Sequence, residues 1–574
     1  MGTRPPAQIP FPLSSFPGAN PQEGAGRLIN CSAEPLGEGS HQSAPSAQVW
    51  RRQPGFSRHN LTATGQTGYR GGLIVNNLSY EAWNGNASTL DIAGNYVSLG
   101  AFPGSKKISI ARNQNGAGAD IIAVDLDNGA YKLSGGGAPT AYNGGGNLPQ
   151  PNSVCFQDGY FFFTIADGRC FASGINALTQ NSQTFTTANA KADVTLLRGI
   201  AFSGLLWLFS TGHCEVYQDT AQAFPAFPYS RQIVLEYGLV QSNAIAGFEV
   251  GFSELVWVAQ DYGVYWATPG SLQPQKISPP DLDRLIEAEV KAGNTLEASC
   301  YAFGGKKFWV LSSPDWSWEF NFATKKWNER QSLGVNGLQG RWRFTGGHPA
   351  FQKWLGGDQQ TGNLMFIDDA RFDEDGAPQL FRIESGPVRD FPNQIRIARA
   401  DFDFVLGVGQ AVGNFQMTVL GAAAGNGGVV RLTVNDATPL SSIRDDRINV
   451  SGVGGTIEAN GSWHAVKIDD RHIDLIGTVF VNAYTAGGIA IDVTSPAPAP
   501  VCAISTSLDG GITYDVPSIR SLSVQQRTKR ARVSVKNRGL SSALGNRWRI
   551  DVTDPVYTGL LGGTQSSNPR EIGP

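Results

Sequence analysis

The chain has 574 residues, enough for several domains or for one large closed β-architecture, and a formal net charge of −3 at pH 7. That charge excludes a protein that coats nucleic acid non-specifically, which would be basic overall. The sequence has 70 Gly and 32 Pro but only 16% charged residues, whereas charged residues average about 25% in ordinary globular domains. This composition favours many turns between half-buried strands, and it predicts an all-β protein.

Targeting and redox signals are weak. The N-terminal region lacks a basic segment followed by an apolar stretch, so we expect no secretory signal. No run approaches the ~20 apolar residues of a membrane span. The six cysteines show no paired spacing, which argues against a disulfide framework or a zinc site. We therefore expect a protein that is made in a reducing cytoplasm and stays soluble.

Residues 1–68 are rich in Pro, Gly, Ser and Asn and have almost no periodicity. Such a segment predicts an extended N-terminal arm without a core of its own, either disordered or laid across a neighbouring surface. One compact island stands out within it, around Arg27, Asn30 and Glu34.

Residues 69–390 repeat one pattern, in which two short apolar runs flank a turn and predict a hairpin. The hairpins are 159–172, 205–217, 255–267, 298–311 and 352–367. Their aromatic markers, Tyr160, Trp207, Trp257, Phe308 and Trp354, are 47, 50, 51 and 46 residues apart. This period is typical of propeller blades. We expect six blades, or seven if the run 73–83 opens its own; the alternative is a β-sandwich with coincidental spacing. The only helix we expect spans 280–292.

A different β-domain is expected from residue 391, in two halves, 391–419 and 498–574, with a small β-barrel inserted at 420–497. Residues 395–405 alternate polar and apolar side chains, so Asp401 and Asp403 share one face. The alternation breaks at 407–413, and a compatible strand resumes only after the Pro-rich stretch 496–500. The interruption at both places is what predicts an insertion.

The second half of this domain contains an Asp-box pattern, in which an Asp side chain and glycines stabilise a tight hairpin and an aromatic side chain anchors it. The residues that fit the pattern are Ser507, Asp509, Gly511, Thr513 and Tyr514. We interpret the box as a folding device.

Residues 516–550 contain nine Lys or Arg and no Asp or Glu. In a strand, the side chains of Arg530, Arg532, Lys536 and Arg538 share one face. We expect negatively charged groups to lie opposite this basic face. The favoured candidates are Asp401 and Asp403 as internal ion-pair partners on an adjacent strand; acids of a neighbouring subunit and the phosphates of DNA in a channel stay open.

Enzyme signatures are absent from the sequence. The six His show no metal-ligand spacing, and neither a nucleophile elbow nor a phosphate-binding loop occurs. We expect no catalytic residue, no metal and no cofactor. Because Asp boxes occur in sialidase-like propellers, a glycan-binding or glycan-hydrolysing propeller is the alternative function, although fold alone is weak support for it.

Several motifs together resemble one family, the packaged-DNA stabilisation protein, also called the tail hub or nozzle, of short-tailed (podovirus) bacteriophages. The motifs in chain order are Arg27–Cys31 with Glu34; Glu215–Tyr217, Phe227–Arg231, Tyr237, Trp257 and Ile277; and Asp509–Tyr514, Arg530–Arg532, Arg538–Leu540 and Asp554. Tyr514 stands where the family usually has Trp. The insertion is similar to the FCCH-type β-barrel of ubiquitin-activating enzymes, at 454–461 and 483–488.

The resemblance implies a non-enzymatic virion protein located in the phage tail and made in the cytoplasm of the bacterial host. It implies a homo-oligomeric ring, a hexamer, that docks below the portal–adaptor channel, closes the head and retains packaged DNA. The implied partners are other copies of the chain, the head-to-tail adaptor, and fibre, spike or plug proteins, with DNA only in transit and no membrane span.

Overall fold

The computed structural model describes residues 6–36, 46–60, 64–133, 136–191, 195–247, 249, 251–334, 336–369, 371–406, 415–438, 440, 446–492, 500–522 and 530–570. The protein is all-β, with α1 (Pro280–Lys291) as the one α-helix among these residues. The chain divides into two compact units. Unit 1 comprises Met1–Thr62, Lys326–Asn336 and Ile367–Pro574, and unit 2 comprises Ala63–Lys325 and Gly337–Phe366.

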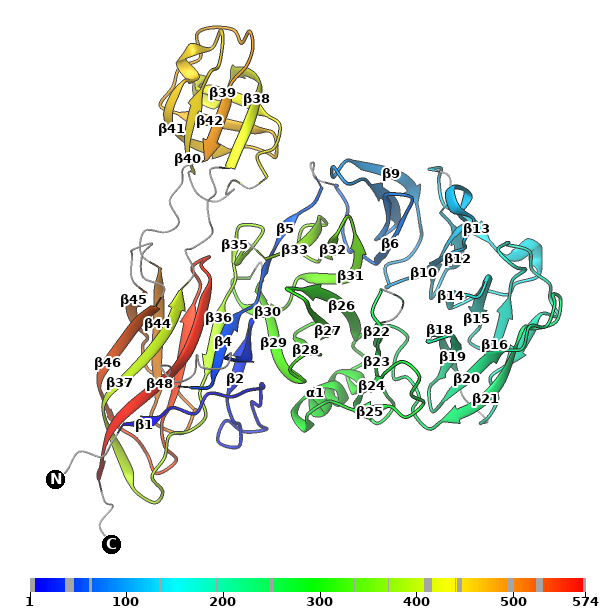
Figure 1. The fold of residues 1–574 in the computed structure, drawn as a ribbon, viewed down its shortest axis with the longest axis horizontal. Helices are drawn as coiled ribbons and strands as arrows, with labels where there is room; N and C mark the ends of the chain where they lie inside the picture. The colour runs from blue at the N-terminus through cyan, green and yellow to red at the C-terminus, as the bar shows by residue number, and fades with distance from the viewer. Residues whose placement is uncertain are drawn as a thin grey trace. The chain divides into compact units, whose positions relative to one another are not determined.

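Unit 2 is a β-propeller with seven blades among its described residues (Figure 1). Five blades are four-stranded sheets: β6–β9 (Gly71–Val75, Leu78–Trp83, Asn86–Leu90, Tyr96–Ala101), β10–β13 (Ser109–Arg112, Ile121–Asp125, Gly129–Lys132, Thr140–Tyr142), β14–β17 (Ser153–Gln157, Tyr160–Thr164, Arg169–Ala172, Phe185–Thr187), β18–β21 (Leu196–Phe202, Leu205–Ser210, Cys214–Asp219, Tyr229–Leu235) and β22–β25 (Ile245–Gly247, Leu255–Val258, Val264–Ala267, Gln275–Lys276). The other two are β26–β28 (Glu297–Phe303, Lys306–Ser312, Ser317–Asn321) and β31–β33 (Phe344–Ala350, Lys353–Asp358, Leu364–Asp368), and a short strand, β30 (Gln339–Arg341), lies between them in the chain. The first strands β6, β10, β14 and β18 adjoin in turn, as do β22, β26 and β31, and β31 lies against β6, which closes the ring.

The five predicted hairpins are confirmed as the antiparallel pairs β15–β16, β19–β20, β23–β24, β26–β27 and β32–β33. Every aromatic marker lies in the second strand of its blade. In neighbouring blades, Trp207 and Trp257 are both buried, and their rings pack edge to face with centroids 6.4 Å apart. The repeating aromatic side chain therefore marks the second strand of each of these blades, which is why its spacing predicts the propeller.

The period is less regular at the N-terminal side. Counting one period back from Tyr160 leads to β10, the first strand of its blade, whereas the other markers lie in second strands. The reason is that this blade is shorter, since its second strand, β11, begins only 39 residues before β15. The run 73–83 does open its own blade, β6–β9, which brings the number of blades to seven. A buried ion pair fastens that blade to the next, with Arg70 Nη2 2.5 Å from Asp125 Oδ2 and both side chains 1% exposed.

Unit 1 is built on two sheets. The first has the strand order β3-β4-β48-β37-β46, with β1 on β48, and the second contains the order β29-β2-β36-β47-β44-β45. Their bounds are β1 (Ala7–Gln8), β2 (Arg27–Ile29), β3 (Cys31–Pro35), β4 (Gln48–Arg52), β29 (Lys326–Leu333), β36 (Phe381–Glu384), β37 (Gln394–Leu406), β44 (Val501–Ser507), β45 (Ser518–Ser521), β46 (Arg530–Leu540), β47 (Arg547–Val552) and β48 (Thr558–Arg570). A short parallel pair, β5 (Gly55–Arg58) with β34 (Asp373–Glu374), continues into β35 (Ala377–Pro378).

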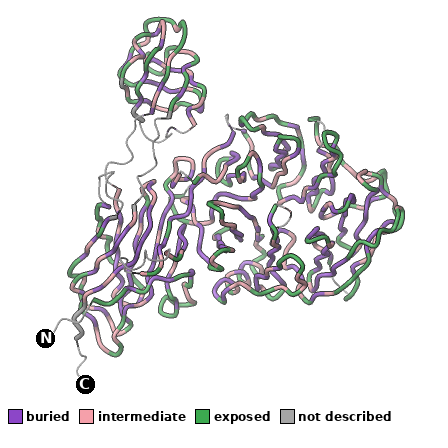
Figure 2. The backbone as a smooth tube through the Cα atoms, viewed as in Figure 1, coloured by how far each residue is buried: buried purple, intermediate pink, exposed green. Residues whose placement is uncertain are grey.

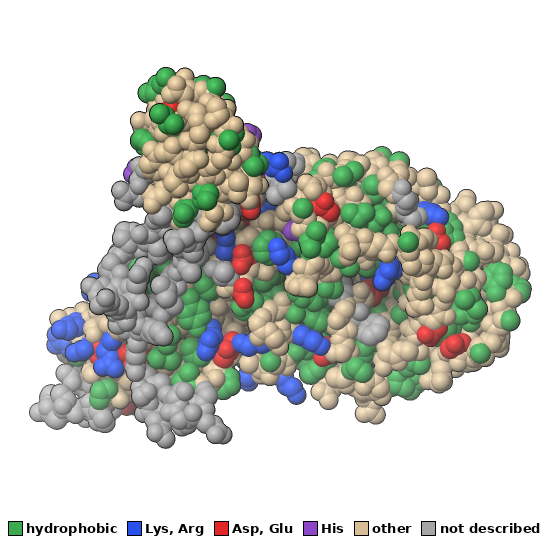
Figure 3. Space-filling model, turned by 45° about the horizontal axis from the view of Figure 1, so that its top comes forward, with side chains coloured by type: hydrophobic (Ala, Val, Ile, Leu, Met, Phe, Trp, Pro, Cys, Tyr) green, Lys and Arg blue, Asp and Glu red, His purple; other side chains and the backbone are tan. Residues whose placement is uncertain are grey.

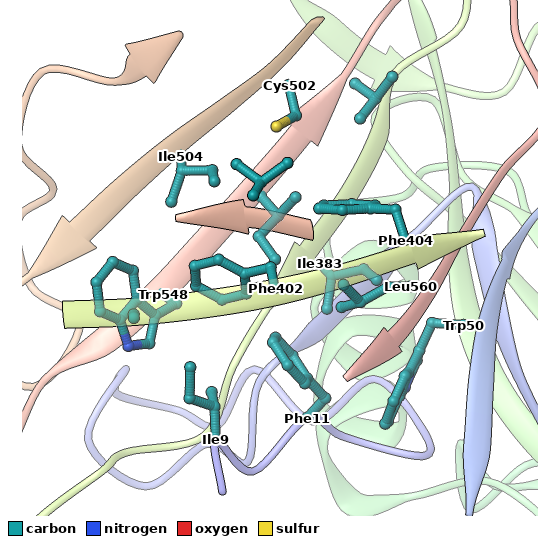
Figure 4. Packing of buried hydrophobic residues seen from close by; sticks show 14 of the residues in the cluster. Ile9, Phe11, Trp50, Ile383, Phe402, Phe404, Cys502, Ile504, Trp548 and Leu560 are labelled. Atoms are coloured by element: carbon teal, nitrogen blue, oxygen red, sulfur yellow. The ribbon is translucent and has the colours of Figure 1, made fainter. Parts of the chain in front are cut away.

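The N-terminal segment is part of this unit's core. Figure 4 shows Phe11 between Phe402 and Trp50, with Trp548 in the same cluster. The ring centroids are 5.3 Å apart for Phe11 and Trp50, and 5.3 Å apart for Phe402 and Trp548. The segment that we expected to be an extended arm thus forms β1–β5 and pairs with strands of its own chain. Its apolar residues are too sparse for a separate core, but they fill the core of the C-terminal sheets.

The insertion between β37 and β44 is a closed barrel of six strands, in the order β38-β39-β42-β41-β40-β43. Their bounds are Phe415–Ala424, Val430–Val434, His472–Ile476, Gly461–Lys467, Asp446–Ser451 and Ile489–Asp492. It has its own apolar core, which includes Met417, Leu432, Ile448, Ile473 and Leu475. The breaks predicted at 407–413 and 496–499 lie outside the described residues.

Burial follows the strands in both units. Figure 2 shows buried stretches along the strands and exposed ones mostly at turns. In the part of the chain that the structure describes, no helix is long and apolar enough to cross a membrane.

The place of Trp50 gives a test of the N-terminal segment. Trp50 is 3% exposed, and its Nε1 donates to the carbonyl oxygen of Pro12 at 2.7 Å. We expect Trp50→Ala to lower the free energy of unfolding of unit 1 by about 3–5 kcal/mol, because it empties a packed site. Calorimetry should show the melting transition of unit 1 falling while that of the propeller holds. Val516→Ala, at a side chain that is 85% exposed, is the control; equal effects of the two substitutions would contradict the packing.

Candidate interaction site

The Asp-box hairpin follows β44 and is held by one carboxylate. Asp509 accepts hydrogen bonds from the backbone N–H groups of Ile512 and Thr513, at 3.0 Å each, and from the Thr513 hydroxyl at 2.6 Å. The Ser507 hydroxyl donates to Asp509 at 2.7 Å and accepts from the Gly511 N–H at 2.7 Å. Although partial burial raises the pKa of Asp509, these donors outweigh it and lower the pKa to about 2.

The basic strand is β46, which pairs with β37 so that Arg532 lies opposite Asp403 and Ser534 opposite Asp401. Arg532 Nε donates to Asp403 Oδ1 at 2.8 Å. Asp401 accepts from the Arg399 guanidinium at 2.7 Å and from the Ser534 hydroxyl.

The other three basic residues differ from Arg532 in their surroundings. Arg538 Nη1 donates to Asp515 at 2.9 Å. Lys536 is exposed and lies opposite Arg399 across the strand pair. Arg530 begins β46, but its side chain lies outside the described residues. Among the three basic side chains that the structure describes, it therefore pairs one, Arg532, with one of the two candidate aspartates, Asp403.

The residues of the arm island position β2. Arg27 donates to Glu329 through Nε at 3.0 Å and through Nη2 at 2.5 Å. Asn30 has a φ of +50° and donates to the carbonyl oxygens of Gln331 and Leu380, at 2.8 and 2.7 Å. Glu34 pairs with Arg51 at 3.3 Å. These contacts fix the edge-to-edge placement of the N-terminal strands within unit 1.

A cavity of about 250 Å³ opens beside the Asp-box hairpin. Its lining residues all belong to unit 1: Pro17, Gly18, Pro21, Gly26, Arg27, Glu384, Gly511, Tyr514, Arg547 and Arg549. We call this cavity the arginine pocket.

Strand register explains why its charged residues meet. Arg27 of β2 lies opposite Glu384 of β36, and Glu384 lies opposite Arg549 of β47. Residues directly opposite one another share a face of the sheet, so the three side chains form one row. Arg547 is two residues from Arg549 on the same face and lies opposite Ser507 of the Asp box.

The guanidinium groups of β47 have different surroundings. Arg549 Nε donates to Glu384 Oε1 at 2.9 Å, and its guanidinium lies 3.7 Å from the centroid of the Tyr514 ring. Burial, with Glu384 nearby, raises the pKa of Tyr514 to about 12, so its hydroxyl is protonated at neutral pH. Arg547 is 4% exposed; its Nη2 donates to the Gly24 carbonyl at 2.6 Å, and its Nε has no hydrogen-bond partner among the described residues.

Sequence reasoning did not find this pocket as a site. It singled out Arg27, Gly511 and Tyr514 for other reasons, and it counted Arg547 and Arg549 only as two of nine basic residues. The available signal was their spacing of two, which in a strand points both side chains to one face. Nothing in the sequence pattern pointed to Glu384 as a site residue. Among the described residues, no group of three His, Cys, Asp or Glu side chains could hold a metal ion.

The pKa of Asp509 predicts an acid-sensitive hairpin. Its value in the folded state, about 2, lies below the usual 3.8, so ionised Asp509 contributes stability above about pH 4. That contribution is lost as the pH falls toward 2. We expect Asp509→Asn to melt lower than wild type at pH 7 and to lose less stability between pH 4 and 2. Asp369→Asn, at an exposed acid of the same unit, is the control, and parallel pH profiles for wild type and Asp509→Asn would contradict the assignment.

Charge reversal at Arg532 and at Lys536, on one face of β46, should have opposite effects on the melting temperature of unit 1. Arg532→Glu places a carboxylate against Asp403 and should lower the melting temperature of unit 1; Arg532→Gln should cost about 1 kcal/mol or less, since the arginine side chain is mostly exposed. Lys536→Glu should be neutral or slightly stabilising, because it removes a like charge opposite Arg399. Thermal unfolding measures all three, and similar losses for the two glutamate variants would rule out the pairing.

The comparisons with known proteins bear on the propeller. Residues 41–371, more than half of the chain, match the family model described as Bacteriophage P22 Gp10, beta-propeller. Among solved structures, the chain is similar to the WD40 propeller domain of Doa1, with 8% identity, 55% of this chain and 97% of that chain covered, and a TM-score of 0.34. It is similar to the Myceliophteria thermophila Cps50 (Swd1) propeller domain, with 10% identity, 55% of this chain and 100% of that chain covered, and a TM-score of 0.36. It is also similar to BamB from Moraxella catarrhalis, with 12% identity, 60% of this chain and 98% of that chain covered, and a TM-score of 0.34.

No curated protein matches the chain. The family match spans the propeller that the structure shows and agrees with the order of the sequence motifs. The chain belongs to the Bacteriophage P22 Gp10 β-propeller family and is a structural, DNA-stabilising protein of a phage.

Proposed function

We propose that this protein forms a hexameric ring, the tail hub or nozzle, below the portal–adaptor channel of a short-tailed phage. In this role it closes the filled head, retains the packaged DNA and provides docking sites for spikes, fibres or a plug. The observation that carries the proposal is the family match over residues 41–371. The resemblances at Arg27–Cys31 and Asp509–Tyr514, outside the matched residues, support the same assignment.

The architecture supports a load-bearing and non-enzymatic role. A closed propeller is rigid, and its radial repetition leaves only short, protected sheet edges. A ring of identical subunits requires heterologous head-to-tail interfaces that close by rotation, and such interfaces work best between rigid bodies.

The charge distribution supports transit of DNA rather than tight binding. Figure 3 shows few charged side chains among neutral surface on the face that it draws, in keeping with a content of 16%. On β37 and β46, Asp401 and Asp403 accept from Arg399 and Arg532. Each phosphate that a protein neutralises adds salt-dependent affinity, so a weakly charged lining suits a conduit through which DNA slides.

The glycan alternative rests on the Asp box alone. As the sequence predicts, the hairpin of Ser507 and Asp509 lies outside the propeller, in unit 1. We therefore keep the structural role as the proposed function.

Virions test this proposal directly. A phage that lacks this chain should fill its heads but lose DNA from them, with infectivity restored when the wild-type chain is supplied in trans. The purified 61.3 kDa chain should form a six-subunit species by native mass spectrometry, and labelled antibody should mark the tail vertex. Stable filled heads without the chain, or a chain absent from purified virions, would refute the proposal.

A further inference from the structure

We propose that the arginine pocket of unit 1 is a binding site for a carboxylate presented by an acidic peptide segment of another protein. The inference goes beyond the proposed function and rests on the pocket alone, whether or not the chain forms a ring.

The pocket offers donor groups that are not used inside the protein. Arg547 is buried, and its Nε has no hydrogen-bond partner among the described residues. Arg549 contacts Glu384 through Nε only, and its guanidinium stacks on Tyr514. A guanidinium donates and never accepts, so the group that completes this site is an acceptor. The planar fork of arginine matches a carboxylate in two-point geometry.

The charge balance indicates one negative charge. Three arginines line the pocket, and Glu384 is the only acid among the lining residues. Glu329, just outside the lining, binds Arg27. The sum of these five groups is one positive charge, because Tyr514 stays neutral. A carboxylate balances that charge, whereas a phosphate monoester carries about −1.5 to −2 at neutral pH.

The remaining walls indicate what carries the carboxylate. Pro17, Pro21 and the Tyr514 ring offer apolar surface next to the arginines, and the glycines of the lining offer no side-chain partner for sugar hydroxyls. A carboxylate on a short alkyl chain, as in glutamate, contacts both kinds of wall. The volume of about 250 Å³ accepts one side chain with its backbone, not a folded domain.

The packing over Arg547 requires a glycine at position 511. A Cβ atom at this position would lie 2.9 Å from Arg547 Cδ and 3.2 Å from Nε. Gly511 also has a φ of +106°, a conformation that favours glycine. The Asp box therefore does more than close a hairpin: it holds a residue without a side chain over the buried guanidinium.

The test uses the full chain and small probes. N-acetyl-glutamate amide should bind saturably in ligand-observed NMR and raise the melting temperature of unit 1, and N-acetyl-glutamine amide should bind at least tenfold more weakly. Arg549→Gln should weaken binding of the glutamate probe at least tenfold. Arg549→Lys, which keeps the charge and loses the fork, should lose most of the affinity while its near-ultraviolet circular dichroism stays that of the wild type.

The control is Arg169→Gln, which removes an arginine paired with Asp167 at 2.7 Å in unit 2 and should leave binding unchanged. The proposal is overturned if the glutamate probe shows no saturable binding at tens of millimolar, or if folded Arg549 variants bind it as well as wild type. Tighter Arg549-dependent binding of N-acetylneuraminate or phosphoserine would also overturn it, and would assign the pocket to a sugar acid or a phosphate.

Discussion

The insertion of β2 between β29 and β36 is the constraint on which unit 1 depends. This three-residue strand is parallel to β29 and antiparallel to β36, and its residues Leu28 and Ile29 are each 1% exposed. Ile29 pairs with Glu329 and Leu28 pairs with Ile383, both far along the chain, so the sheet cannot close until the C-terminal part has been made. Pairing across such distances carries a large loop-closure cost, which the buried side chains must offset.

The same insertion creates the row of charges at the arginine pocket. Arg27 of β2 lies opposite Glu384 of β36, and Glu384 lies opposite Arg549 of β47, so the three side chains form one row across the sheet. The Asp box then covers the end of this row with Gly511 and Tyr514. Arginine is suited to such a place because its delocalised charge is weakly hydrated and can stack on an aromatic ring.

The propeller depends on a different kind of interaction. Its blades are local hairpins, and the ring is held by aromatic packing between neighbours, as between Trp207 and Trp257, and by the buried pair of Arg70 and Asp125. Removing either charge of such a pair would leave the other buried and unpaired, which costs far more than the pair contributes. The closed ring, with its protected edges, is consistent with a structural component of a phage.

The sequence by itself determined whatever is local: the hairpins, the aromatic period of the propeller, the helix α1, the small barrel and the Asp box, because turn chemistry and side-chain alternation act over a few residues. Tertiary structure alone decided the number of blades, since one blade is shorter than the period. It decided the place of the described N-terminal residues, 6–36 and 46–60, whose apolar side chains are too few to show a pattern. It also decided the arginine pocket. Arg27, Glu384, Tyr514 and Arg549 come from distant segments, and only strand register brings them to one face.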